Sequence, residues 1–318
     1  MHFAFTDEQL ALGATVRDVL RAHCPPAALR AERRPAWDQL AELGFFGLLL
    51  PPELDGLGLG LTDVLPAIEE TGRACLPGPV VETAVAAPFL VPYVPKLASG
   101  TVCVAVLPPG QAYAADADLA DVLVVADARR VLSRHEVRLT PRRSVDPCRP
   151  LFEITSAREG GELGVERVGG AVRAVTVATA AQLVGVAREL LAVSVAYART
   201  RRQFGVAIGT FQAVKHQLAD VAVAVEFAAP MVHRAALSVD RSAPTAERDV
   251  SAAKAAAGEA ATLAARTALQ THGAIGYTEE LDLRFWLARA WSLSSAYGTA
   301  PEHRERVRTR LDDLRRYP

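Results

Sequence analysis

The 318-residue sequence is poor in several kinds of residue, and each shortage argues against a class of protein. Lysine and arginine together number 35 and aspartate and glutamate 36, so the formal net charge at pH 7 is −1. A chain with no positive excess has no general field to attract nucleic acid or an anionic membrane surface. Lysine occurs only at Lys96, Lys215 and Lys254, so arginine carries nearly all the positive charge, and its planar fork suits phosphate or carboxylate groups. We therefore expect no nucleic-acid partner.

Cysteine and long apolar runs are also scarce. The four cysteines are Cys24, Cys75, Cys103 and Cys148. They are far apart, form no C-x-x-C pair and follow no recognisable secretory leader, which predicts reduced thiols in a cytoplasmic protein. The longest apolar run begins at Val175 and meets Arg188 and Glu189 before it reaches spanning length. The sequence therefore predicts no membrane span.

The common catalytic and metal-binding patterns are missing as well. No histidine stands at metal-ligand spacing from a second histidine or a cysteine, so we expect no metal site. The GLGLG stretch at 56–60 lacks both a preceding strand and a completed G-x-G-x-x-G pattern, so it does not predict a dinucleotide-binding loop. Neither a G-x-S-x-G elbow nor a Walker sequence is present.

Periodicity predicts a mainly α fold with a small β lobe, in three parts. Residues 1–96 read as a helical domain, beginning at a capping box in Thr6-Asp7-Glu8-Gln9, with helices near 36–46 and 61–75 on either side of a loop, PPELDGLGLG. Residues 97–169 read as a short β domain with strands in VCVAVL, DVLVVAD, VRLT and LFEITSA. Residues 170–318 return to helical spacing, with helices near 174–200, 210–240, 245–272, 279–295 and 300–315.

Two polar junctions interrupt the last group of helices. The first is Arg201-Arg202-Gln203-Phe204-Gly205, running on to Gln212, and it offers cations and an aromatic ring. The second is QTHGAIG from Gln270, where Gly273 can adopt the left-handed conformation that closes a helix and leave backbone donors open. Together the junctions would suit a pyrophosphate. From the residues alone, a surface arginine pair and a glycine helix cap are the favoured explanation.

A family resemblance favours the interpretation of the two junctions as a pyrophosphate site. RRQFGVAIGTFQAVKHQLAD, QTHGAIGYTEELDLRFWLARA and a later Tyr-Gly-Thr resemble the carboxy-terminal helical domain of acyl-CoA dehydrogenases. LAELGFFGLLLPPELDGLGLGLTDVLPAIEETGRA resembles the family's helical first domain. The resemblance implies an acyl-CoA dehydrogenase-like fold and FAD held between subunits, its pyrophosphate met by the first motif of one chain and the second motif of another. The implied residues are Arg201, Phe204 and Gln212 in the first motif, Gln270, Gly273 and Ala274 in the second, and Thr299. Ala274 stands where the family has a second glycine.

The resemblance also implies an activity and partners. Family members desaturate an acyl thioester by removing an α-proton while hydride passes to flavin N5. The implied partners are an acyl-CoA or acyl-carrier thioester, an electron-transfer flavoprotein or similar acceptor, and further copies of this chain or of a related chain, with the carboxy-terminal bundle making the oligomer.

The sequence departs from the family at the catalytic base. Many relatives carry a glutamate just before the Gly-Thr pair, and this chain has Tyr297 there. A phenol with a pKa of about 10 is a weak base at neutral pH. The alternative position, in RAVTVATAA, has no carboxylate, and Glu189, Asp220 and Glu226 read as solvated or salt-bridged side chains. The β lobe is abbreviated too, because the family's T-E-P-x-x-G-S-D stretch is missing between residues 90 and 170.

Three hypotheses remain. In the first, the chain is an acyl-CoA dehydrogenase with a displaced base. In the second, it is the base-lacking subunit of a mixed oligomer, like one of the two chains of heteromeric dehydrogenases in bacterial steroid side-chain breakdown. Or it is a helical scaffold of the same fold without cofactor or chemistry, against which the retained cofactor residues argue.

Overall fold

Short helices build the amino-terminal part of the computed structural model, which describes residues 4–90, 96–157 and 160–316. Helix α1 (Asp7–His23) begins at the predicted capping box, in which Thr6 and Gln9 each accept from the other's backbone N–H. The elements that follow are α2 (Pro26–Ala31), α3 (Trp37–Glu42), the 3-10 turns η1 (Phe45–Gly47) and η2 (Pro52–Leu54), α4 (Leu61–Arg73) and α5 (Val80–Leu90). The predicted loop at 51–60 is irregular apart from η2. The sequence did not predict α5.

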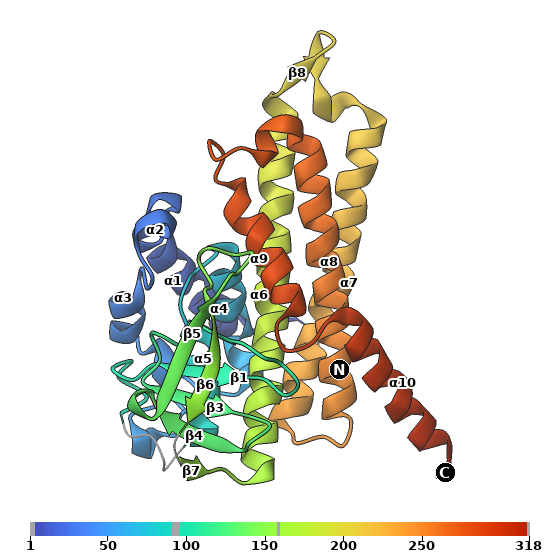
Figure 1. The fold of residues 1–318 in the computed structure, drawn as a ribbon. Helices are drawn as coiled ribbons and strands as arrows, with labels where there is room; N and C mark the ends of the chain where they lie inside the picture. The colour runs from blue at the N-terminus through green and yellow to red at the C-terminus, as the bar shows by residue number, and fades with distance from the viewer. Residues whose placement is uncertain (1–3, 91–95, 158–159, 317–318) are drawn as a thin grey trace.

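Two small sheets form the β lobe. The first has strand order β1-β3-β4-β7, with only β1 and β3 parallel, and the second has order β2-β6-β5 and is antiparallel throughout. Their bounds are β1 (Val104–Leu107), β2 (Ala114–Ala115), β3 (Val122–Val125), β4 (Arg130–Ser133), the 3-10 turn η3 (Arg134–Glu136), β5 (Val137–Arg142), β6 (Leu151–Ala157) and β7 (Gly161–Glu162). The four strands expected from sequence correspond to β1, β3, β5 and β6. In Figure 1 the lobe lies beside the lower half of the long helix α6.

A helical bundle occupies the rest of the chain. Its elements are α6 (Val165–Thr200), the hairpin β8 (Arg202–Gln203) and β9 (Val206–Ala207), η4 (Ile208–Thr210), α7 (Gln212–Asp240), α8 (Ala246–His272), η5 (Gly273–Tyr277), α9 (Leu283–Ser295) and α10 (Ala300–Arg316). Helix α6 starts well before the predicted residue 174, whereas α7 and α8 begin and end close to the predicted limits. Alanine-rich α8 packs against α6, α7, α9 and α10, which confirms its predicted central place.

Helix α6 also joins the bundle to the amino-terminal helices. A Cβ added at Gly72 on α4 would lie 2.1 Å from the carbonyl oxygen of Gln182, and one added at Gly185 on α6 would lie 2.0 Å from that of Glu69. The two helices therefore touch backbone to backbone, and only glycine allows this approach. One continuous core runs through both helical parts.

By length and composition alone, α6 and α7 are each apolar enough to cross a membrane. This corrects the expectation that the charges at Arg188 and Glu189 rule such a segment out. Inside the molecule 83% of the apolar window of α6 is buried, against 44% for α7. Packing within the core accounts for the apolar character of α6.

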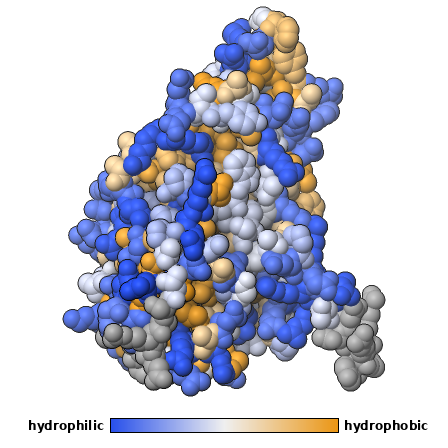
Figure 2. Space-filling view, in the orientation of Figure 1, coloured by the Kyte–Doolittle hydropathy of each residue, from blue (hydrophilic) through white to orange (hydrophobic). Residues whose placement is uncertain are grey.

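The upper end of the bundle exposes hydrophobic side chains. Phe204, at the tip of the β8–β9 hairpin, is 92% exposed, and Val206 is 41% exposed. Figure 2 shows hydrophobic residues at this tip, next to hydrophilic ones. Phe227, on the outer side of α7, is 74% exposed.

Candidate flavin and acyl site

The first polar junction forms a short hairpin at the end of α6. Arg201 caps this helix, and its backbone N–H donates to the carbonyl of Tyr197 at 2.8 Å. Phe204 and Gly205 form the turn between β8 and β9 with φ values of 52° and 80°. In the part of the chain that the structure describes, the exposed Arg201 side chain has no salt bridge. The junction thus presents a free guanidinium to solvent.

The second junction lies beside the first. Gln270 is exposed in the last turn of α8, and the helix ends at Gly273, where the 3-10 turn η5 begins. Gly273 has the expected positive φ of 63°, but its ψ of −142° lies outside the left-handed helical region that the sequence predicted. The ring of His272 stacks on that of Tyr197, with 4.3 Å between the centroids, and so joins the two junctions. The structure therefore brings together the predicted cofactor residues at one end of the bundle: Arg201, Phe204, Gln212, Gln270, Gly273 and Ala274.

This end of the bundle fits a diphosphate group. A Cβ placed on Gly273 or on Gly205 would find no atom within 4 Å, so the backbone is open to a ligand at both junctions. Arg201 supplies an unpaired fork of donors, and the first turn of α7, which starts at Gln212, has no side-chain cap on its N–H groups. The site is exposed on its outer side, where the Phe204 side chain faces solvent.

Thr299 lies apart from the other predicted cofactor residues. It follows Gly298, whose carbonyl accepts a hydrogen bond from Lys254 at 3.0 Å. From Lys254 to Gln270 the helix α8 rises roughly 24 Å. The hydroxyl of Thr299 donates to Glu302 at 2.9 Å. Within one chain, Thr299 and the Arg201 junction therefore cannot touch the same phosphate.

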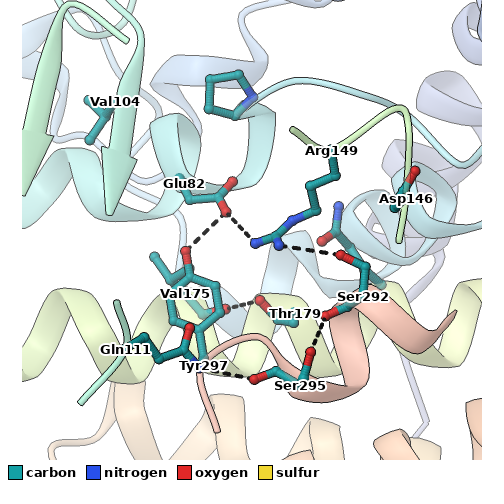
Figure 3. A network of polar contacts seen from close by, with 12 residues as sticks. Glu82, Val104, Gln111, Asp146, Arg149, Val175, Thr179, Ser292, Ser295 and Tyr297 are labelled. Carbon is teal, nitrogen blue, oxygen red and sulfur yellow. Dashed lines mark hydrogen bonds and ion pairs between the residues drawn. The ribbon is translucent and has the colours of Figure 1, made fainter. Parts of the chain in front are cut away.

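Tyr297 occupies the turn between α9 and α10 and is 4% exposed. Its hydroxyl donates to Oε1 of Glu82 on α5 at 3.0 Å, and Nη2 of Arg149 lies 3.9 Å from the same oxygen. Arg149 also donates to Oγ of Ser292 on α9 at 3.5 Å. Figure 3 shows the side chains of Glu82, Arg149 and Tyr297 converging. The amino-terminal helices, the β lobe and the bundle thus meet at one polar cluster.

The electrostatics of this cluster favour the protonated form of Tyr297. Burial, and then the nearby Glu82 carboxylate, raise the pKa of the Tyr297 phenol well above its usual value. Burial also raises the pKa of Asp116 to about 7, against the opposing effect of the Arg149 and Arg33 cations.

The carboxylates on the flanking helices are paired. Glu189 lies 3.6 Å from Arg73 and Glu226 lies 3.6 Å from Arg188, so these two carboxylates are salt-bridged as expected.

Three cavities surround the Tyr297 turn. One of about 280 Å³ lies against the β lobe and is lined by Gln111, Arg149 and Tyr297, among others. A second, of about 530 Å³, runs from Tyr297 between α6, α8 and α10. A third, of about 460 Å³, is lined by Trp291 and Thr299 between α8 and α9. Tyr297 therefore forms part of the wall between the first two cavities.

The second cavity combines apolar walls with cations. Its apolar residues include Val168, Val172 and Val250, and its arginines are Arg173, Arg306 and Arg310, with Glu247 and Glu305 also present. Such a groove suits a ligand with an apolar tail and an anionic head. Among the described residues, no group of three or more histidine, cysteine, aspartate or glutamate side chains is placed to hold a metal ion.

Sequence reasoning did not find Glu82, Arg149 or Lys254. Glu82 is separated from Tyr297 by 215 positions and has no motif around it. Arg149 lies in a connection before β6, among prolines and arginines. Only the folded chain brings these side chains together.

The family of this chain follows from its similarity to known proteins. Residues 6–101 match the model of the acyl-CoA dehydrogenase N-terminal domain, and residues 164–311 match that of the C-terminal domain. The chain is similar to acyl-CoA dehydrogenase IpdE2 of Mycobacterium tuberculosis, with 32% identity over 300 residues that cover 89% of this chain and 91% of that protein.

Solved structures show the same fold. The ChsE4-ChsE5 complex from Mycobacterium tuberculosis is similar with a TM-score of 0.86 and 22% identity, over 98% of this chain and 99% of that one. The glutaryl-coenzyme A dehydrogenase glutaryl-CoA complex is similar with a TM-score of 0.85 and 24% identity, over 99% of this chain and 97% of that one. The matches to both family domains, together with the two helical domains around a β lobe, identify the chain as an oxidoreductase. The chain belongs to the acyl-CoA dehydrogenase family, and the cofactor that this membership implies is FAD.

Proposed function

We propose that this chain is the base-lacking subunit of a two-chain, FAD-dependent acyl-CoA dehydrogenase. The observation that carries the proposal is Tyr297, which stands at the position of the family's glutamate, is buried, and donates a hydrogen bond to Glu82. A phenol held in this way keeps its proton, so it cannot take one from the carbon beside a thioester. The carboxylate that removes the α-proton then comes from a related chain.

The separation of the cofactor residues supports the involvement of a second chain. The ribityl bridge between a flavin ring and its first phosphate reaches roughly 8–9 Å when extended, at about 1.2 Å per single bond. The Arg201 junction and the Tyr297 turn of this chain are roughly 24 Å apart along α8. A flavin whose phosphates lie on Arg201 therefore cannot place its ring at the Tyr297 turn of the same chain, and a second chain would have to supply that turn.

In this arrangement the residues of the upper end bind and orient the cofactor. Arg201 donates to the diphosphate, the open backbone at Gly273 and Ala274 lets it come close, and Gln270 and Gln212 offer polar side chains beside it. Phe204, exposed at the hairpin tip, covers the nucleotide from water. When bound, the flavin accepts the hydride that leaves the β-carbon of the thioester.

The groove beside α10 suggests the substrate class. Arg173 and Arg310 pair with Glu247 in the groove, so a CoA or acyl-carrier phosphate would compete with this carboxylate for them, beside Arg306. The valines of the groove match an acyl or pantetheine chain. The reduced flavin would pass its electrons to an electron-transfer flavoprotein or a similar acceptor. All four cysteines are free and buried, which supports a place in the reducing cytoplasm.

A second candidate is an enzyme that uses Glu82 as a displaced base. The carboxylate lies 3.0 Å from the Tyr297 hydroxyl, so a proton could pass through that hydroxyl to Glu82. This candidate needs no second chain for its base.

Substitutions in the co-expressed complex separate the two candidates. With the base on the partner, Tyr297→Phe and Glu82→Gln should leave kcat within about a factor of two, because neither group receives a proton from the substrate. With Glu82 as the base, Glu82→Gln should lower kcat by roughly 10²- to 10⁴-fold. Steady-state dehydrogenation of acyl-CoA thioesters, with flavin content measured in parallel, gives the answer, and a loss of that size would refute our assignment.

A further inference from the structure

The turn that carries Tyr297 has a strained backbone and needs support. Tyr297 has a φ of 58° and Gly298 a φ of 110°. The left-handed region is unfavourable for a bulky residue such as tyrosine, so surrounding contacts must hold it there. Residues 295–300 contribute to the walls of all three cavities. The conformation of the turn thus sets the shape of each cavity.

Two buried side chains hold this turn from behind. Nζ of Lys254 on α8 donates to the carbonyl of Ser294 at 3.1 Å and to that of Gly298 at 3.0 Å. Nε2 of His303 lies 3.1 Å from the carbonyl of Tyr297. Both side chains are 1% exposed. A Cβ added at Gly298 would lie 2.8 Å from Nε2 of His303, so the turn and its supports fit closely.

We propose that Lys254 is the positioning residue of the Tyr297 turn, and that its two hydrogen bonds fix the wall between the cavity against the β lobe and the groove beside α10. A lysine is costly to bury, and an aliphatic residue of similar length would fill the space without that cost. The two carbonyls it contacts lie on either side of the strained residue.

The protonation state of Lys254 is compatible with this role. Burial lowers the pKa of its amine to about 7, and the Arg149 and Arg306 cations act in the same direction. A neutral amine has two N–H groups, which equals the number of carbonyls it contacts. The support therefore does not depend on the positive charge.

Hydrogen exchange of the chain, followed by mass spectrometry, tests the proposal without cofactor or partner. The N–H groups of Ala296, Gly298 and Thr299 are hydrogen-bonded within the turn. Lys254→Met should speed their exchange about tenfold or more, because two hydrogen bonds that hold the turn closed are lost. Lys254→Gln keeps an amide nitrogen with two N–H groups on a shorter side chain and should give an intermediate rate. Lys96→Met makes the same change at an exposed lysine and should leave the rates unchanged.

The consequence for binding rests on the proposed function. In the co-expressed complex, Lys254→Met should weaken acyl-CoA binding several-fold, because the turn lines the groove beside α10, while Lys96→Met should not. A folded Lys254→Met chain with wild-type exchange at 296–299 overturns the proposal, and so does faster exchange with unchanged acyl-CoA affinity. If Lys254→Met does not fold, Lys254→Gln decides by the same two measurements. Failure of the wild-type complex to bind FAD would contradict the proposed function, while the exchange rates would still decide the role of Lys254.

Discussion

Replacing Asp146 by alanine should lower the free energy of unfolding by about 3–5 kcal/mol. Oδ2 of Asp146 accepts from Nε of Arg289 at 2.5 Å, and the side chains are 0% and 3% exposed. The pair links the connection before β6 to α9. Without Asp146 the guanidinium keeps its bond to the carbonyl of Leu76 at 2.7 Å, but its charge is buried and unpaired. Urea unfolding followed by circular dichroism measures the loss.

Two further variants show whether burial causes this effect. Glu259→Ala breaks the exposed pair with Arg304, whose side chain is 66% exposed, and should cost less than about 1 kcal/mol. The double variant Asp146→Leu with Arg289→Met should recover much of the loss, because no unpaired charge remains. If Asp146→Ala costs no more than Glu259→Ala, the buried pair does not hold the β lobe to α9.

Replacing Arg201 by alanine should weaken FAD binding to the two-chain complex by roughly 10- to 100-fold. A hydrogen bond to a charged group contributes about 1.5–3 kcal/mol, and each 1.4 kcal/mol corresponds to about a factor of ten in affinity. The Arg201 side chain is exposed and has no salt bridge within the described residues, so its removal should leave stability nearly unchanged. Flavin fluorescence titration of the apo-complex measures the dissociation constant.

Arg202 provides the matched control. It follows Arg201 in the same hairpin, carries the same charge, and donates to the carbonyl of Gly205 at 3.5 Å. Arg202→Ala should weaken FAD binding by no more than about threefold, the size expected of a screened surface charge. Equal losses for the two variants would mean that the hairpin attracts the cofactor by general charge and that Arg201 does not bind the diphosphate.

The carboxy-terminal bundle was largely predictable, because its helices are long and periodic. The sequence indicated 210–240 and 245–272, and the structure has α7 at Gln212–Asp240 and α8 at Ala246–His272. Helix α5 was missed because VVETAVAAPFL is apolar on all sides and contains Pro88, so it shows no stripe. The β8–β9 hairpin was missed because each of its strands has only two residues.

The predicted cofactor residues lie in sequence motifs, whereas the polar cluster around Tyr297 does not. Arg201 and Gln270 lie in short sequence patterns, and Tyr197 stacked on His272 brings those patterns together. Glu82, Arg149 and Lys254 come from three separate parts of the chain. Their contacts depend on how α5, the β lobe and α8 pack around one turn, and no local sequence pattern predicts that packing.

The central claim is that this chain lacks the catalytic base and works with a related chain. The most direct test compares the purified chain with the complex that it forms when co-expressed with a related acyl-CoA dehydrogenase chain. The measurement is the bleaching of the flavin absorption band after addition of acyl-CoA thioesters. We predict no bleaching for this chain alone and rapid bleaching for the complex. Bleaching by this chain alone, at the rate of the complex, would contradict the account.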